Sequence, residues 1–177
     1  MKTKIILTIL VVLAGAYPVR ADLVFDSGYN IFDDSYPYYD EVAVINDAHL
    51  DVIGGEIGQL QFIYSSTGNI YAVSMGKLVT SDNAFVNIYG GSFDFFSFHA
   101  MSYVDLYAYD VTIHPDGGTN NLPWIAGKYY LDNSAFAVTF YDADDISHLS
   151  IVPEANSIML FAFGVLFLTK RNSKRTI

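Results

Sequence analysis

The stretch Leu-Asp-Val-Ile-Gly-Gly at residues 50–55 decides the fold of this chain. Its apolar and β-branched residues predict a short strand, and its paired glycines predict a turn, because Gly adopts φ > 0 without a steric penalty. Two other stretches have the same form: Ala-Val-Ser-Met-Gly at residues 72–76 and Val-Asn-Ile-Tyr-Gly-Gly at residues 86–91. The chain therefore repeats a unit of one strand and one glycine turn.

The repeated unit has a loose period. The corresponding positions Leu50, Ile70, Val86 and Val104 recur at similar but unequal intervals. Short strand-turn units of this length indicate a solenoid, since one coil cannot bury its apolar face alone and stacks on its neighbours. We expect an all-β chain that forms a short right-handed parallel β-helix of three or four coils. A β-sandwich is the alternative, because short strands and the turn at residues 116–118 also suit antiparallel pairing.

The pattern changes after Ile113. A turn-rich segment at residues 114–121 is followed by two apolar and aromatic runs, at residues 124–131 and 134–141, with Asp132-Asn133 between them. Two such runs around a short polar link predict a β-hairpin. We expect this hairpin to cap the C-terminal end of the stack, and residues 142–148 to form a polar exit loop.

The N-terminus has the pattern of a cleaved export signal. Lys2 and Lys4 precede an apolar run at residues 5–13, and small residues follow it. Signal peptidase is expected to cut after Ala16 or Ala21. The sequence therefore predicts a helical signal peptide at residues 1–21 and a single acidic ectodomain at residues 22–151.

The C-terminus carries a second sorting pattern, with a hydrophobic segment at residues 155–169 and a basic end at residues 170–175. As a helix, its most apolar part at residues 158–168 would span about 16 Å, against about 30 Å for a bilayer core. We expect a hydrophobic helix that inserts transiently into the inner membrane. Positive charge beside an apolar stretch stays on the cytoplasmic side, which makes the basic end a stop signal. Its residues are Lys170, Arg171, Lys174 and Arg175.

The motif before this segment is Val152, Pro153, Glu154 and Ala155. Together with the hydrophobic segment, the basic end and the signal peptide, it resembles the PEP-CTERM sorting family, and the resemblance covers residues 152–175. It implies processing by an exosortase-like enzyme in a bacterium that makes exopolysaccharide, and a final location on the cell envelope surface or outside the cell. Ala155 departs from the family pattern, which has a second proline there, so efficient processing of this tail is the open point. Glycine-paired coils, a hairpin and a sorting tail also resemble repeat-bearing exported proteins of such bacteria, a resemblance that implies architecture and no activity.

The ectodomain is strongly acidic and contains no cysteine. Residues 22–152 hold Lys77 and Lys128 against eighteen Asp and Glu, a formal charge of 2 − 18 = −16. Nucleic acid and anionic membrane surfaces are therefore not expected as partners, because both select for basic patches. The absence of Cys excludes disulfides and a thiol nucleophile.

Two acidic stretches are the candidate binding residues. Asp142, Asp144 and Asp145 could bind Ca²⁺ through carboxylate oxygens, but they lack the Gly and terminal Glu of an EF-hand loop, and a solvated loop is the simpler interpretation. Acidic residues at 33–34 and 40–41 surround tyrosines at 36–39, which suit either a sugar or cationic ligand or a cap on the first coil; we favour the cap. The four histidines show no metal-ligand spacing, so we expect no cofactor apart from the Ca²⁺ alternative.

No catalytic residues are predicted, since the chain has no Gly-x-Ser-x-Gly elbow and no phosphate-binding loop. The enzymatic alternative is a β-helix glycosidase or polysaccharide lyase. A glycosidase needs two carboxylates across one cleft, and a lyase needs Lys or Arg to neutralise a uronate, of which residues 22–152 hold two. We therefore expect an exported structural or interaction protein of the cell surface or extracellular matrix, associated with exopolysaccharide or envelope glycan.

Overall fold

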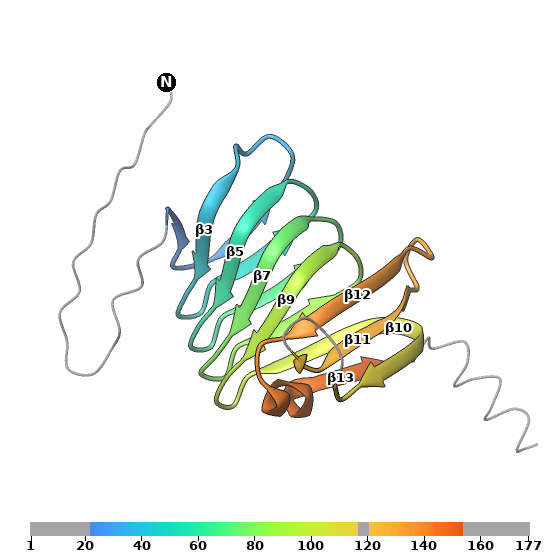
Figure 1. The fold of residues 1–177 in the computed structure, drawn as a ribbon. Coiled ribbons are helices and arrows are strands. Elements are labelled where there is room, and N and C mark those ends of the chain that lie inside the picture. Colours follow the sequence, from blue (N-terminus) through green and yellow to red (C-terminus); the bar gives the residue numbers. More distant parts are fainter. Residues whose placement is uncertain (1–21, 117–120, 154–177) are drawn as a thin grey trace, which may run out of the picture.

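The computed structural model describes residues 22–116 and 121–153 of the chain. The predicted signal peptide at residues 1–21 and the tail from Glu154 onward lie outside the described residues, as does part of the turn at residues 116–118. The described part is nearly all strand and forms a β-solenoid of about five turns (Figure 1). The expected solenoid is confirmed over the β-sandwich, with more coils than the three or four visible in the sequence.

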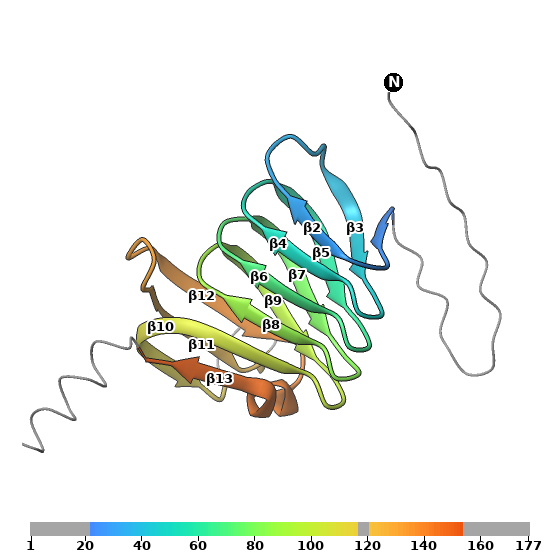
Figure 2. The same cartoon turned by 180° about the vertical axis from the view of Figure 1, so that it is seen from behind.

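Successive strands alternate between two facing sheets, so each coil contributes one strand to each sheet (Figures 1 and 2). All pairs within the stack are parallel. Sheet A contains β1 (Leu23–Phe25), β3 (Tyr39–Val44), β5 (Glu56–Phe62), β7 (Ser74–Thr80) and β9 (Ser92–Phe98). Sheet B contains β2 (Tyr29–Phe32), β4 (His49–Val52), β6 (Thr67–Ile70), β8 (Phe85–Ile88) and the first part of β10 (Tyr103–His114).

The coil length is constant through the middle of the stack. In sheet B, Leu50 pairs with Gly68, Gly68 with Val86, and Val86 with Val104, so each step along the sequence is equal. The sequence-based prediction that Leu50 and Ile70 occupy equivalent positions in successive coils was wrong, because Ile70 pairs with Val52. Gly68 of β6 stands at the inward position that Leu50 and Val86 occupy in the neighbouring coils. The reason is steric, because a Cβ on Gly68 would collide with the ring of Phe62 from sheet A.

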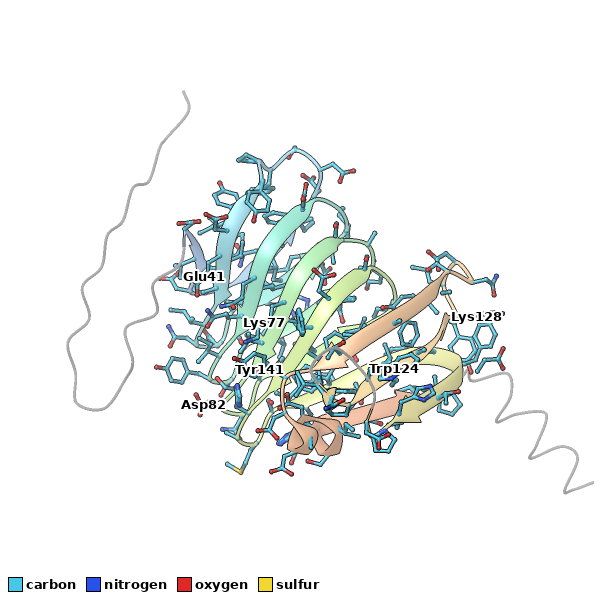
Figure 3. The ribbon with its side chains drawn as sticks, viewed as in Figure 1. Glu41, Lys77, Asp82, Trp124, Lys128 and Tyr141 are labelled. Carbon is cyan, nitrogen blue, oxygen red and sulfur yellow. The ribbon has the colours of Figure 1, made fainter. Side chains whose placement is uncertain are left out.

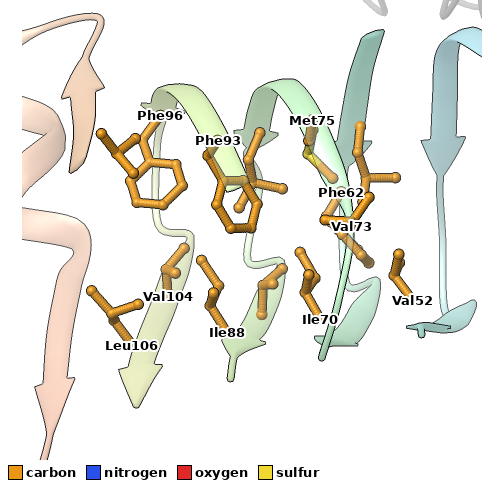
Figure 4. Packing of buried hydrophobic residues seen from close by; sticks show 14 of the residues in the cluster. Val52, Phe62, Ile70, Val73, Met75, Ile88, Phe93, Phe96, Val104 and Leu106 are labelled. Atoms are coloured by element: carbon orange, nitrogen blue, oxygen red, sulfur yellow. The ribbon is translucent and has the colours of Figure 1, made fainter. Parts of the chain in front are cut away.

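The core lies between the two sheets and consists of inward side chains from every coil (Figure 4). Phe62 and Phe96 of sheet A are fully buried, as are Ile70, Ile88 and Leu106 of sheet B. Burying a side chain of this size contributes about 1.5–3 kcal/mol. Because the chain has no cysteine, this apolar stack and the hydrogen bonds of the parallel strand pairs hold the coils together.

The predicted hairpin is confirmed, and it closes the C-terminal end of the stack. The second part of β10 pairs antiparallel with β11 (Trp124–Tyr129), which pairs antiparallel with β12 (Ala135–Phe140). β12 then runs parallel to β9, so the hairpin joins the two sheets. A register shift between Tyr109 and Thr112 of β10, with Asp110 at φ 52°, marks the β-bulge where this strand leaves sheet B for the hairpin.

Two elements follow the hairpin. Where the sequence predicted a polar exit loop at residues 142–148, the structure has a 3-10 helix, η2 (Ala143–His148). β13 (Leu149–Val152) then pairs parallel with β10 at the outer edge of sheet B. No helix in the described ranges is long and apolar enough to cross a bilayer.

Two tyrosines pack on Phe32 of the N-terminal coil. Tyr36 stacks on Phe32 with ring centroids 4.7 Å apart, and Tyr39 meets the same ring edge-on at 6.3 Å. Tyr38, in contrast, is 54% exposed. The cap interpretation of residues 33–41 therefore holds for Tyr36 and Tyr39.

Candidate functional site

The predicted cation-binding residues lie at the start of η2, and their oxygens bind the backbone. Asp142 is the N-cap residue and accepts a hydrogen bond from the amide of Asp144. The buried Asp145 accepts from the amide of Phe98 at 3.1 Å and from that of Asp142 at 3.0 Å. Burial raises the pKa of Asp145, although these amide hydrogen bonds oppose the shift. The carboxylate of Asp145 thus fastens η2 to β9.

Metal ligands do not come together in the part of the chain that the structure describes. Across residues 22–116 and 121–153, no three His, Asp or Glu side chains are grouped so that they could hold a metal ion. Of the predicted sorting motif, Val152 and Pro153 are described, and Val152 is the last residue of β13, paired with Tyr107. Glu154, Ala155, the predicted basic stop signal and the cleavage candidates Ala16 and Ala21 lie outside the described residues.

One constellation has the residue types of a nucleophilic triad. Ser97 Oγ lies 2.9 Å from His99 Nε2, and this histidine is close enough to Asp145 to oppose the rise in the pKa of that carboxyl. Ser97, however, is fully buried, and both oxygens of Asp145 accept hydrogen bonds from backbone amides. A nucleophile must reach its substrate, so this group is structural.

The outer face of sheet B carries the most regular set of polar and aromatic side chains. Because side chains alternate along a strand, Leu50 and Val52 of β4 point into the core while the residues between and beside them point outward. The register aligns the outward residues of successive coils in three columns. The first column is His49, Thr67, Phe85 and Tyr103; the second is Asp51, Asn69, Asn87 and Asp105; the third, just beyond the paired residues, is Ile53, Tyr71, Tyr89 and Tyr107. We call these three columns the sheet B face.

A hydrogen-bond network joins the N-terminal half of this face. Asn69 Nδ2 donates to Asp51 Oδ1 at 2.8 Å, and Asn87 Nδ2 donates to Asn69 Oδ1 at 2.9 Å. His49 Nε2 lies 2.9 Å from Asp51 Oδ1, and the Tyr29 hydroxyl donates to the other oxygen of the same carboxylate. Partial burial on its own would raise the pKa of Asp51, but the hydrogen bonds from Tyr29, Asn69 and His49 outweigh it, so the pKa of this carboxyl is lowered.

The third column is a ladder of stacked tyrosines. Tyr71 and Tyr89 have ring centroids 5.0 Å apart and an interplanar angle of 7°, and Tyr89 and Tyr107 are 4.3 Å apart at 24°. Since the ring faces cover one another, the ladder offers ring edges and hydroxyl groups to its surroundings. Burial, reinforced by the neighbouring Tyr107, raises the pKa of Tyr89 to about 12, so its hydroxyl stays protonated and able to donate.

The C-terminal half of the sheet B face contains polar groups that make no side-chain hydrogen bond within the described ranges. Among the described residues, the carboxylate of Asp105 and the Oδ1 of Asn87 make no side-chain hydrogen bond, whereas Asn69 and Asp51 are engaged. The hydroxyl of Tyr89 has that of Tyr107 as its neighbour. Beside them, Phe85 is 37% and Tyr103 60% exposed. We call this group the β8–β10 patch: Phe85, Asn87, Tyr89, Tyr103, Asp105 and Tyr107.

The sheet B face carries no Lys or Arg side chain. Lys77 lies on β7 of sheet A, with its ammonium 4.3 Å from the ring centroid of Tyr141, and Lys128 lies on β11 of the hairpin, 6.0 Å from that of Tyr109 (Figure 3). These are the two basic residues of residues 22–152. The patch therefore presents hydroxyl, amide and carboxylate groups without Lys or Arg.

The sheet B face was not predicted from the sequence. Its signal is present in the sequence, because the Asp and Asn residues of the second column recur at one constant interval, as do the three tyrosines of the third. Aligning Leu50 with Ile70 shifted one coil by two positions and hid both columns.

The fold and the face define the class of protein as a β-solenoid with a polar and aromatic outer sheet. No protein-family model, no curated protein and no solved structure matches the chain.

Proposed function

We propose that the chain is an exported protein of the cell surface or extracellular matrix that associates with extracellular polysaccharide and catalyses no reaction. The observation that carries the proposal is the sheet B face: a regular array of hydrogen-bonding and aromatic side chains on a rigid stack. A signal peptide at residues 1–21 and a PEP-CTERM-like tail at residues 152–175 would bring this face outside the cell, with signal peptidase and an exosortase-like enzyme as processing partners.

The positions of the carboxylates support binding over hydrolysis. Asp51 and Asp105 are the two acids of the sheet B face, and the register places them three strands apart in one column. At about 4.8 Å per strand, they are about 14 Å apart, whereas glycosidases hold their two carboxyl groups about 5–10 Å apart. Asp51 is also engaged by three donors, which removes it as a free acid or base.

Recovery of the protein from its native host tests the address. We expect a chain that begins after Ala16 or Ala21, ends close to the motif at residues 152–155, and is found outside the inner membrane together with exopolysaccharide. Mass spectrometry of the terminal peptides and cell fractionation measure both. A chain that reaches Ile177 in the membrane fraction would show that Ala155 prevents processing, and an uncut N-terminus in the cytoplasm would refute export.

A second experiment separates the binding protein from the enzyme. The purified chain is incubated with the host's polysaccharide, and both retention of the protein on the polymer and release of reducing ends or unsaturated products are measured. We expect retention without release. Release of products would establish the carbohydrate-active enzyme, and an absence of both would remove the polysaccharide as a partner.

A further inference from the structure

We propose that the β8–β10 patch is the binding site of an uncharged polysaccharide, which lies along the solenoid axis and crosses the strands of sheet B. This inference rests on the proposed function and deepens it, since it names the face, the residues and the charge class of the ligand.

The patch repeats one set of groups in two successive coils. Phe85 and Tyr103 are partners across β8 and β10, as are Asn87 and Asp105, and Tyr89 stacks on Tyr107 at 4.3 Å. Neighbouring strands lie about 4.7–4.9 Å apart, so an aromatic, a polar and a tyrosyl group recur at that interval along the axis. A polymer with repeating hydroxyl groups can make the same contact more than once on such a surface, which adds avidity to weak single contacts.

The chemistry of the patch complements a polyol. Asn87 has a free carbonyl oxygen that accepts, Asp105 accepts, and the hydroxyls of Tyr89 and Tyr107 both donate and accept. The exposed rings of Phe85 and Tyr103 provide apolar surface for the C–H groups of a sugar. Small-molecule binding sites combine these two features, apolar rings and a few polar groups that fix orientation.

The N-terminal half of the sheet B face differs from the β8–β10 patch, because its polar side chains contact one another. There His49 lies against Thr67 at 2.7 Å and against Asp51 at 2.9 Å, and Tyr29 stacks on His49 with centroids 5.0 Å apart. Its polar groups therefore satisfy one another. The N-terminal half therefore has a structural role. The carboxylate of Asp105 and the Oδ1 of Asn87 in the β8–β10 patch remain available to a ligand.

The negative charge of the ectodomain argues against an acidic polysaccharide as the ligand of the patch. No Lys or Arg lies on the sheet B face, and residues 22–152 carry a formal charge of −16 by the count given above, so a uronate-rich polymer would be repelled. A polycation would be attracted to the acidic surface as a whole. Its binding would fall steeply with salt and would not depend on the patch.

The test uses the full chain, purified in a polyoxyethylene detergent, which carries no sugar of its own. Dextran, mannan and a mixed-linkage β-glucan serve as uncharged probes, alginate as the acidic probe and chitosan as the cationic probe. Affinity gel electrophoresis measures retention at low and high salt. We expect retention by an uncharged polymer that is insensitive to salt, and none by alginate.

Two variants locate the site, and a third serves as their control. Asp105→Asn keeps the shape of the side chain, and the double variant Tyr89→Phe/Tyr107→Phe keeps the ring stack and removes its hydroxyls. Each should weaken retention by roughly fivefold or more, as expected for the loss of one or two hydrogen bonds of about 1 kcal/mol. The matched control is Gln59→Ala on β5, an outward residue of the opposite sheet. Circular dichroism and urea unfolding confirm that each variant folds.

The outcomes separate this inference from the proposed function. Weaker retention of an uncharged polymer by folded patch variants, with Gln59→Ala unchanged, supports the inference. Unchanged retention by the patch variants overturns it and leaves glycan association standing on another surface. Retention of chitosan alone, abolished by salt, overturns the uncharged class. Failure of the wild-type chain to bind these polymers and the host's own polysaccharide overturns both proposals.

Discussion

The side-chain amide of Asn87 donates a hydrogen bond to Asn69 at 2.9 Å, and the two residues lie one coil apart. Asn69 repeats the geometry by donating to Asp51 at 2.8 Å. The ladder therefore has a direction: each amide donates toward the N-terminal coil, and the last acceptor is a carboxylate, which makes the strongest acceptor of the three.

We predict that Asn69→Ala destabilises the solenoid more than Asn87→Ala does. Asn69 both accepts and donates in this row of hydrogen bonds, so its loss removes one of the three donors to Asp51 and leaves the side-chain amide of Asn87 without its acceptor. We expect a loss of about 1–2 kcal/mol for Asn69→Ala and about half of that for Asn87→Ala. Urea unfolding measures both, and equal losses would contradict a ladder of coupled hydrogen bonds.

A second prediction concerns the pH dependence contributed by Asp51. Its pKa is lower in the folded chain than in the unfolded chain, where it is about 3.9. The carboxylate therefore stabilises the fold above about pH 4, and this contribution is lost as the pH falls through the lower folded value. The difference in unfolding free energy between wild type and Asp51→Asn should be largest near neutral pH and shrink under acid. A difference that grows on acidification would refute the assignment.

The third prediction tests whether Asp145 has a structural role or belongs to a calcium site. Asp145→Ala removes the acceptor of two backbone amides and should cost about 2–3 kcal/mol, with or without EDTA. The control Asp144→Ala changes an exposed carboxylate in the same turn and should stay within about 0.5 kcal/mol. Thermal unfolding in Ca²⁺ and in EDTA measures both, and a destabilisation that appears only in Ca²⁺ would favour the cation site.

Gly76 provides a steric prediction. A Cβ at this position would lie 2.7 Å from the carbonyl oxygen of Gly58 in the preceding coil. The backbone of Gly58 cannot move aside without disturbing the pairing of β5 with β7. We expect Gly76→Ala to cost about 1–3 kcal/mol, the usual range for overpacking. Ser74→Ala, an exposed position of the same strand, is the control and should be nearly neutral. Urea midpoints that coincide for the two variants would show that the coils are not closely stacked there.

The fifth prediction has the opposite sign. Tyr129 is fully buried, and its hydroxyl has no hydrogen-bond partner in the described structure. Burial raises its pKa well above the usual range, so it is a neutral group whose hydration is lost on folding. Tyr129→Phe should therefore raise the unfolding free energy by about 1 kcal/mol. Tyr109→Phe, which loses a hydrogen bond to Asn133, should lower it slightly, and a destabilised Tyr129→Phe would reveal a partner for the hydroxyl.

The sequence predicted the solenoid because strand length, glycine turns and approximate spacing are local properties. The hairpin at residues 124–141 was predicted for the same reason. The register was not, since it depends on a contact between sheets: the ring of Phe62 occupies the space of a side chain at Gly68, and the apolar column is interrupted there. A search for hydrophobic residues passes over a glycine that is buried for this reason.

The sheet B face escaped prediction because its meaning depends on that register. Asp51, Asn69 and Asn87 are ordinary outward residues when taken singly, and they become a ladder only when the coil length brings them side by side in space. The acidic cluster at residues 142–145 was visible in the sequence, yet its partner, the amide of Phe98, is 47 residues away and could not be inferred.

Val152 ends β13 and is also the first residue of the predicted sorting motif. Under the proposed sorting, the processing enzyme would therefore act directly at the end of the folded solenoid. A chain held by the proposed tail would be held at the end of the stack formed by β10 and β13, while β1 and β2 form its other end. Molecules attached in this way would all have the same orientation. The coil of β1 and β2 would lie farthest from the point of attachment, and the sheet B faces of neighbouring molecules would run parallel.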